Sequence, residues 1–255
     1  MTMTTRIHLA AEGFAEGDRY ERSRPGYPRE AVAELCAVCD IGPGRRVLDL
    51  AAGTGKLTRE LLACGANVVA VEPVAGMRDQ LASTVAGIAV LDGTAERLPL
   101  DDGSIDAVTV GQAFHWFDGS AALREIHRVL APGRAVGLIW NVMDRRVPWV
   151  GRLQEVIHRH RGPNPWYAGH AWRDAFTRDI GFAPLGHRQF TNSQTVDIAG
   201  LIDRVASISF IATLPDDACA GVMTEIRQIV AEDLPAKDRF AIPYVTDVFW
   251  SHRER

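Results

Sequence analysis

Long apolar runs are absent from this 255-residue chain, and so is a secretory leader. No stretch reaches the roughly 18 uninterrupted apolar residues that a membrane-spanning helix requires. The N-terminus carries only a short apolar patch at residues 7–11, followed directly by Glu12, instead of the sustained apolar segment of a signal peptide. We therefore expect a cytoplasmic protein without a membrane span.

An excess of basic residues is also missing. Lys and Arg number 28 against 32 Asp and Glu, which gives a net charge of −4 and a pI near 6.1. Proteins that bind nucleic acid usually present a clustered basic face, so we expect no nucleic-acid partner. The sequence gives no indication of oligomeric state.

Cysteine is scarce, with four in the chain: Cys36, Cys39, Cys64 and Cys219. The first two form a C-x-x-C pair, but they lie in a segment with helical periodicity, and no second pair completes a zinc-binding set. We therefore expect no metal site. The ordinary proportions of 47% hydrophobic and 24% charged residues predict a soluble globular fold with a sizeable core.

The first half of the chain alternates between apolar runs and helical patterns. Because strands that alternate with helices form parallel sheets, this order predicts a doubly wound α/β fold. Amphipathic helices are expected at residues 30–39, 56–64, 77–85 and 121–130. The predicted strands cover residues 47–50, 67–72, 88–91, 105–110 and 135–140.

The second half is less regular, with helical patterns at residues 150–160, 199–209 and 216–233 and strand patterns at 186–196 and 242–252. The two late strands complete a mostly parallel, seven-stranded, Rossmann-like sheet, and the helices form cap elements. We predict a lid and helix over residues 1–40, a nucleotide-binding core over 41–141, and cap elements with the closing strands of the same domain over 142–255.

A glycine turn follows the first strand, where Asp49 precedes Gly53 and Gly55. Glycine allows the backbone to approach a ligand closely, and the helix that follows offers unpaired N–H groups. The dinucleotide fingerprint needs a third glycine where Thr58 stands, and the spacing of a phosphate-binding loop is missing. We therefore interpret Lys56 as a solvated helix residue.

Five segments carry a family resemblance: YERSRPGYP, VLDLAAGTGKLT, VVAVEP, GTAERLPL and QAFHWFD. Together they resemble the class I S-adenosylmethionine-dependent methyltransferases, in particular the type 11 small-molecule group that includes trans-aconitate methyltransferase-like enzymes. The resemblance spans residues 14–141. The sequence departs from the family pattern at Ala51, which replaces the usual first glycine, and at Thr94, where an acid is common.

The resemblance implies S-adenosylmethionine as the cofactor and S-adenosylhomocysteine as its product. Glu72 would receive the ribose hydroxyls, Gln112 would bind the methionine moiety, and Tyr20 and Arg24 would reach the ligand from the lid. The full set of implied cofactor-binding residues is Tyr20, Arg24, Asp49, Ala51, Gly53, Gly55, Glu72, Pro73, Met77, Thr94, Ala95, Gln112 and His115.

The acceptor side of the site is less defined. His115 is the candidate general base, although contact with the cofactor and a structural role are equally open, and methyl transfer does not require a base. Trp116, Trp166, Tyr167 and His170 are candidate substrate contacts, with core or cap packing as the alternative.

Three functions fit these features. The first is methylation of a small organic acceptor at oxygen, with a carboxylate as one candidate group. The second is methylation of a quinone-type or lipid acceptor at carbon, because the same core can host either reaction. The third is a non-catalytic module that binds S-adenosylmethionine for regulation.

Overall fold

The computed structural model describes residues 23–167, 172–177, 180–234 and 238–254. Tyr20 and His170, predicted as lid and substrate contacts, lie outside the described residues. The same holds for residues 14–22 of the predicted lid. Their predicted roles therefore stay predictions.

The fold is one seven-stranded sheet with the strand order β3-β2-β1-β4-β5-β7-β6. The first five strands in chain order run parallel to one another, and β7 is antiparallel to both of its neighbours. This confirms the predicted α/β fold with seven strands. The strands are β1 (Arg46–Leu50), β2 (Asn67–Val71), β3 (Ala89–Leu91), β4 (Ile105–Gly111), β5 (Leu130–Met143), β6 (Gly186–Val196) and β7 (Phe240–His252).

Helices cover both faces of the central strands. On one face α3 (Arg29–Val38) and α4 (Lys56–Ala63) share a hydrophobic cluster with β1, while α6 (Gly119–Val129) packs in a second cluster with β4 and β5. The short helix α5 (Ala75–Thr84) buries Leu81 beside β2. Strands β1 and β2 are buried beyond their first residue, as expected for parallel strands between two helix layers.

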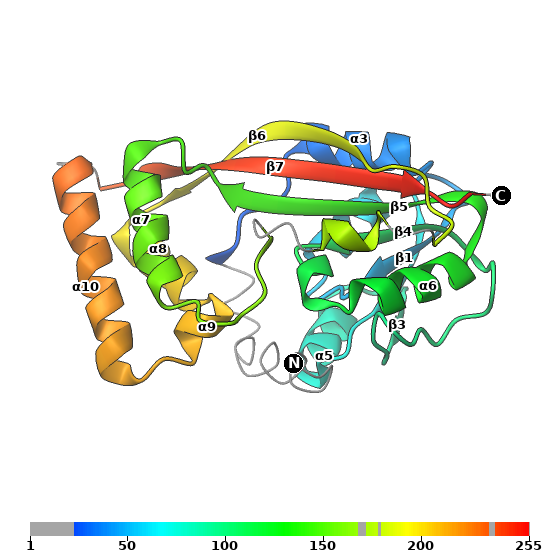
Figure 1. The fold of residues 1–255 in the computed structure, drawn as a ribbon, viewed down its shortest axis with the longest axis horizontal. Coiled ribbons are helices and arrows are strands. Elements are labelled where there is room, and N and C mark those ends of the chain that lie inside the picture. The colour runs from blue at the N-terminus through cyan, green and yellow to red at the C-terminus, as the bar shows by residue number, and fades with distance from the viewer. Residues whose placement is uncertain (1–22, 168–171, 178–179, 235–237, 255) are drawn as a thin grey trace.

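Strand β5 extends beyond β4. Its last pairing with β4 is Gly111 with Ile139, whereas its pairing with β7 continues as far as Met143 and Tyr244. Residues 140–143 therefore project past the central sheet and have a strand neighbour on one side only; we call them the overhang. Figure 1 shows β5, β6 and β7 running from the sheet toward a separate group of helices.

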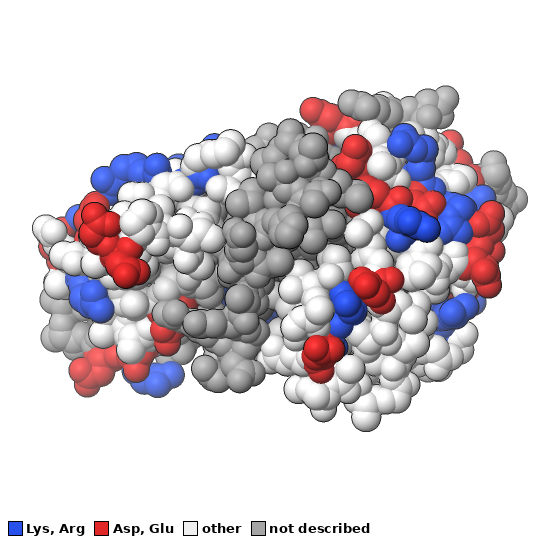
Figure 2. Space-filling model, turned by 90° about the horizontal axis from the view of Figure 1, so that it is seen from below, with Lys and Arg blue, Asp and Glu red and all other residues white. Residues whose placement is uncertain are grey.

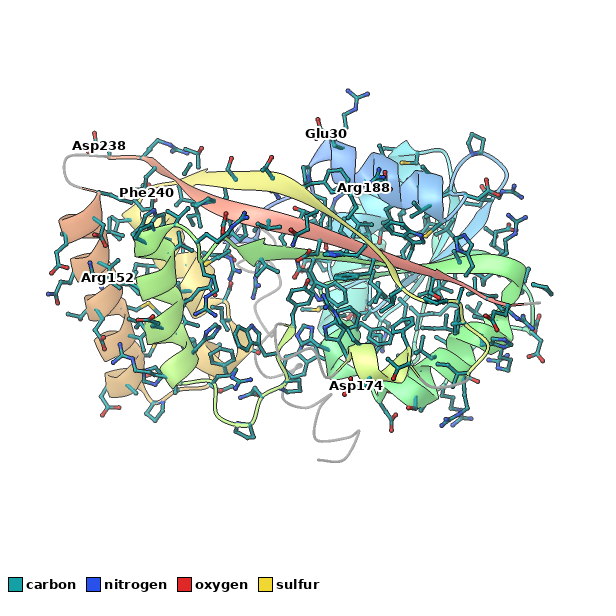
Figure 3. All side chains as sticks on the ribbon, turned by 45° about the horizontal axis from the view of Figure 1, so that its top comes forward. Glu30, Arg152, Asp174, Arg188, Asp238 and Phe240 are labelled. Atoms are coloured by element: carbon teal, nitrogen blue, oxygen red, sulfur yellow. The ribbon has the colours of Figure 1, made fainter. Side chains whose placement is uncertain are left out.

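These helices form a lobe with its own core. It contains α7 (Pro148–Arg159), α8 (Ile198–Ala206), α9 (Ser209–Ala212) and α10 (Asp216–Asp233), which we call the helical lobe. Its buried apolar residues form a cluster that is distinct from those around the sheet. On its surface Arg152, marked in Figure 3, joins α7 to α10 through Glu232 at 2.6 Å and Asp233 at 2.7 Å.

Most predicted elements are present, but the bounds around α6 differ. The helix starts at Gly119 because the Asp118 carboxylate caps it by accepting a hydrogen bond from the Ala121 N–H at 3.1 Å. Strand β5 begins at Leu130, already paired with Ile105, so it is longer than the predicted run of 135–140. The short helix α9 was not predicted, because one helical turn carries no periodic signal.

Charges of both signs are mixed on the surface. Figure 2 shows a face on which the described Lys and Arg side chains lie among Asp and Glu. On the sheet, Arg188 of β6, which Figure 3 labels, forms an ion pair with Glu34 of α3 at 2.6 Å. Across residues 23–254, leaving out the gaps named above, no helix is both long and apolar enough to cross a bilayer.

The packing of α3 on β5 depends on Gly137. A Cβ atom there would lie 2.4 Å from Leu35 Cδ1 and 2.8 Å from Cys39 Sγ, so we expect Gly137→Val to lower the free energy of unfolding by about 1–3 kcal/mol. Urea unfolding measures the change. As a control, Gly221→Ala places a Cβ in open space on α10 and should raise stability by about 0.5–1 kcal/mol. Equal stability of the valine variant and the wild type would contradict this packing.

Candidate active site

The glycine turn after β1 has a constrained backbone. Ala51, Gly53 and Gly55 all have positive φ, at 55°, 58° and 87°. A side chain at position 55 would collide with Leu81, since an added Cβ would lie 2.3 Å from Leu81 Cδ1. Ala51 adopts the same left-handed backbone conformation, which lowers the stability of the fold by about 1–2 kcal/mol because the Cβ atom of alanine is crowded there.

Glu72 holds this turn against the end of β2. Its carboxylate accepts hydrogen bonds from the N–H groups of Gly53 at 2.8 Å and Val74 at 2.9 Å. The side chain is buried, and this burial raises the pKa of Glu72. The two hydrogen bonds lower the pKa, but by less than burial raises it. Because each carboxylate oxygen has more than one acceptor direction, Glu72 can still accept hydrogen bonds from a ligand.

Arg78 ties the ends of β2 and β3 together. Its Nη1 donates to the carbonyl oxygens of Glu72 at 2.9 Å and Pro73 at 2.7 Å, and it lies 3.0 Å from Asp92. Met77, on the same helix, packs beneath the glycine turn, with its sulfur 3.8 Å from the Cβ position of residue 53. The loop after β2 is thus fixed by its own helix.

Asp49 is a buried carboxylate with one oxygen unpaired. Oδ2 accepts a hydrogen bond from the Thr58 hydroxyl at 2.6 Å, whereas Oδ1 has no partner within the described part of the chain. Burial, together with the nearby Glu72 carboxylate, raises the pKa of Asp49 to about 7. Such an oxygen is suited to accept a hydrogen bond from a cationic ligand group.

A cavity opens above the turn, and we call it the glycine-turn cavity. It contains about 570 Å³ of space including its open mouth. Five of the predicted cofactor residues line it: Arg24, Asp49, Ala51, Gly53 and Gln112. Further wall residues are Pro25, Tyr27, Ala52, Thr54, Lys56, Leu57, Gly111, Asn141 and Arg204.

The other predicted cofactor residues that the structure describes lie outside these walls. Gly55 starts α4, and Glu72, Pro73 and Met77 support the turn from behind. Thr94 forms a bridge with Arg97, and its buried hydroxyl has no partner among the described residues. Ala95 is buried in the cluster around α6.

A second cavity, of about 930 Å³ including open space, lies beneath the overhang. We call it the overhang cavity, because all four residues 140–143 line it. His115 and Trp116 border it from the short 3₁₀ helix after β4, and Trp166 and Tyr167 from the loop after α7. The sequence-predicted candidates Trp116, Trp166 and Tyr167 thus share one cavity. The helical lobe supplies the remaining wall through Gln154, Ile157, His158, Arg204, Ile208, Ser209 and Phe210.

Ring packing fixes the aromatic walls. Tyr167 lies 4.8 Å from Trp140 between ring centroids, and its hydroxyl donates to the buried Asp247 carboxylate at 2.6 Å. Trp166 contacts the His158 ring at 4.1 Å, with the Arg161 guanidinium 5.2 Å from its ring centroid. The cavity therefore presents flat apolar surfaces of defined orientation.

His115 is a neutral imidazole in this wall. Burial, together with the positive charge of Arg24, lowers its pKa to about 4. Its Nδ1 is buried with no partner among the residues that the structure describes. His115 can therefore accept or donate one hydrogen bond to a ligand without carrying charge.

The two cavities meet at four residues, which we call the junction residues: Arg24, Gln112, Asn141 and Arg204. Gln112 directly follows β4 with a positive φ of 62°, and its N–H donates to the Ile139 carbonyl at 2.9 Å. Asn141 is held by the Thr246 hydroxyl, which donates to its Oδ1 at 2.6 Å.

Arg204 brings a buried charge to the junction. Its Nε donates to the Tyr244 hydroxyl at 3.2 Å, but its buried Nη1 has no partner in residues 23–254 apart from the stated gaps. The sequence gives no signal for this position, because Arg204 follows another charged residue, Asp203, in a helix that carries no recognisable motif. Asn141 could have been found, since it directly follows the fifth predicted strand, as Gln112 follows the fourth.

The interpretation of Lys56 as a solvated residue is wrong. Its ammonium group donates to the Arg24 carbonyl at 3.0 Å, and the side chain lines the glycine-turn cavity. Lys56 thus connects the turn to the segment that carries Arg24. No group of three or more His, Cys, Asp or Glu side chains suited to a metal ion occurs in the described ranges.

Comparisons with known proteins agree with this arrangement. A family model described as a methyltransferase domain matches residues 48–136. The chain is 41% identical to an uncharacterized methyltransferase of Mycobacterium tuberculosis over 248 residues, which cover 96% of this chain and 97% of the relative. It is 46% identical over 138 residues to the demethylmenaquinone methyltransferase of a Mycobacterium species, covering 52% and 59%. The YcgJ protein of Bacillus subtilis has a similar fold, with a TM-score of 0.58 at 18% identity, covering 89% of this chain and 100% of that one.

The raised pKa of Asp49 predicts a pH-dependent stability. An unfolded aspartate has a pKa of about 3.9, so the folded chain favours the protonated form. This contribution to stability is complete below about pH 4 and is lost as the pH rises through about 7. Asp49→Asn cannot ionise, so relative to the wild type it should gain about 1–3 kcal/mol between about pH 5 and about pH 8. Urea unfolding at both pH values measures this. A constant difference between the two proteins would show that Asp49 does not titrate in this window.

Proposed function

Since this chain belongs to the class I S-adenosylmethionine-dependent methyltransferases, we propose that it methylates an oxygen atom of a small organic acid. S-adenosylmethionine supplies an electrophilic methyl group on a sulfonium, and S-adenosylhomocysteine is the product. What we propose is the identity of the acceptor atom and the residues that bind the cofactor and the acceptor.

One observation carries it: the glycine-turn cavity and the overhang cavity meet at the junction residues. With the cofactor in the first cavity and the acceptor in the second, the reacting atoms come together at this boundary. Methyl transfer by displacement depends on approach and alignment, and holding both reactants in place can lower the barrier by about 7–11 kcal/mol. No further catalytic group is then required.

The residues around the glycine turn fit the cofactor. The unpaired Oδ1 of Asp49 can accept a hydrogen bond from an ammonium group, and Glu72 retains acceptor capacity for two ribose hydroxyls. The turn itself has no Cβ at Gly53, so the backbone can approach a ligand closely. These features support the cofactor-binding roles that the sequence predicts for the three residues.

The polarity of the overhang cavity favours an oxygen acceptor. Neither Asp nor Glu lines it among the described residues, whereas Arg24 and Arg204 do. An amine acceptor would need an anionic partner in such a site. An acid instead finds hydrogen-bond donors in the guanidinium groups of the two arginines and in the side-chain amides of the wall. A carboxylate is already ionised at neutral pH and needs no base; for a hydroxyl acceptor, His115 is the available neutral base.

A second candidate function is carbon methylation of a quinone-type acceptor. It is favoured by the similarity to the demethylmenaquinone methyltransferase. This similarity covers 52% of the chain, and the flat aromatic walls of the overhang cavity are compatible with a ring. The two arginines at the junction make it the weaker candidate.

Methyl-labelled S-adenosylmethionine distinguishes the two functions. We expect the protein to label carboxylic acids from a mixed panel of acids, phenols and quinones. Methyl esters release their label as methanol in alkali, whereas carbon-bound methyl groups are stable. Alkali-stable label on a quinone would contradict the oxygen proposal and support the alternative.

Glu72→Ala tests the proposed ribose contact. Loss of two hydrogen bonds should weaken S-adenosylhomocysteine binding by about 1–3 kcal/mol, which is roughly 5- to 150-fold in Kd. Calorimetric titration measures it, at a temperature where a melting curve shows the variant to be folded. Glu155→Ala, on the exposed face of α7, is the matched control and should bind like the wild type. An unchanged Kd for the Glu72 variant would show that the ribose lies elsewhere.

A further inference from the structure

Arg204 carries a positive charge into the interior of the protein. It is 6% exposed, lies on α8, and borders both cavities. Its hydrogen bond to a described residue is with a neutral hydroxyl, that of Tyr244, and no carboxylate in the described part of the chain pairs with it. Burying a guanidinium without a counter-charge is costly, so such a group is retained where a ligand supplies the anion.

A chain of hydrogen bonds fixes the guanidinium. Arg204 Nε donates to the Tyr244 hydroxyl, which donates to Gln194 Oε1 at 3.3 Å. Gln194 Nε2 then donates to the Ser23 carbonyl at 3.1 Å, next to Arg24 in the chain. Because this series of hydrogen bonds engages Nε, the donors of the buried Nη1 remain available to a ligand.

We propose that Arg204 binds the carboxylate of the acceptor, and that this carboxylate is itself the group that is methylated. The inference rests on the proposed oxygen methylation and names its substrate class. The acceptors are small organic acids with an apolar body. Specificity for the acid depends on Arg204.

The position of Arg204 identifies the methylated group. Because the guanidinium borders both cavities, a carboxylate paired with it lies at the boundary, where the donor methyl arrives. The rest of the acceptor then extends into the overhang cavity, against Trp166, Ile157 and Phe210. Those walls favour an apolar body over a second charged group.

The chemistry is balanced without a proton. A carboxylate oxygen forms the new bond to the methyl carbon, the carbon–sulfur bond breaks, and its electron pair remains on sulfur. The negative charge of the acid and the positive charge of the sulfonium both disappear. The ester can no longer form an ion pair with Arg204, so its affinity falls and release follows.

Matched acids and amides test the binding step. Titrations of the S-adenosylhomocysteine complex use benzoate, trans-cinnamate and octanoate, each beside its primary amide. We expect at least one acid to bind 30-fold or more tightly than its amide. Arg204→Met should abolish this preference, Arg204→Lys should retain part of it, and the Kd of S-adenosylhomocysteine should change by less than twofold.

Thermal melting of the protein without ligands shows whether Arg204 serves ligand binding or the stability of the fold. Arg204→Met removes a buried unpaired charge, so the melting temperature should stay equal or rise. Arg188→Met, at an exposed arginine of β6, is the control and should leave acid binding unchanged. A large loss of melting temperature in the Arg204 variant would overturn the proposal in favour of a structural role.

Two further results would overturn the inference without affecting the methyltransferase assignment. An equal loss of S-adenosylhomocysteine affinity in Arg204→Met would place the cofactor carboxylate on Arg204. Absence of any acid preference in the wild type would exclude a carboxylate anchor. If an acid needs Arg204 for binding but carries an alkali-stable label, its carboxylate serves for binding only and is not the methylated group. If acids bind but no oxygen is methylated, the proposed function itself is refuted.

Discussion

The unequal length of neighbouring strands determines the architecture of the site. Strand β4 ends at Gly111, but β5 continues to Met143 with β7 as its only strand neighbour there. Side chains on residues 140–143 therefore have no neighbouring strand on the β4 side, and the space beside them becomes a cavity. At the end of the paired region of β4 and β5, the Gln112 N–H donates a hydrogen bond to the Ile139 carbonyl. This mismatch sets the overhang cavity directly beside the glycine turn.

The free site carries unbalanced charge of both signs. Asp49 and Glu72 are buried carboxylates at the ends of adjacent strands, and the charge of Glu72 raises the pKa of Asp49. On the other side of the junction, Arg204 is buried without a carboxylate partner among the described residues. Such groups lower stability in the empty protein, which is a common cost of a binding site. Their arrangement matches ligands that carry opposite charges at corresponding points.

The sequence predicted what depends on local pattern. Strand periodicity, the turn at Gly53 and Gly55 and the acid at the end of β2 identified the sheet and its open edge, because each signal lies within a few residues. It could not predict the junction. Arg204 lies on α8 and Asn141 on β5, and they meet only because β5 is longer than β4. The interpretation of Lys56 failed because its partner, the carbonyl of Arg24, belongs to a distant segment of the chain and not to the glycine turn.

The helical lobe has a hydrophobic core distinct from the clusters around β1 and β4. The segment matched by the family model, residues 48–136, ends before that lobe begins. Mutations in α7 to α10 can therefore accumulate without loosening the sheet that holds the glycine turn. Such a separation would let the helical walls of the overhang cavity change while the packing around the glycine turn stays the same.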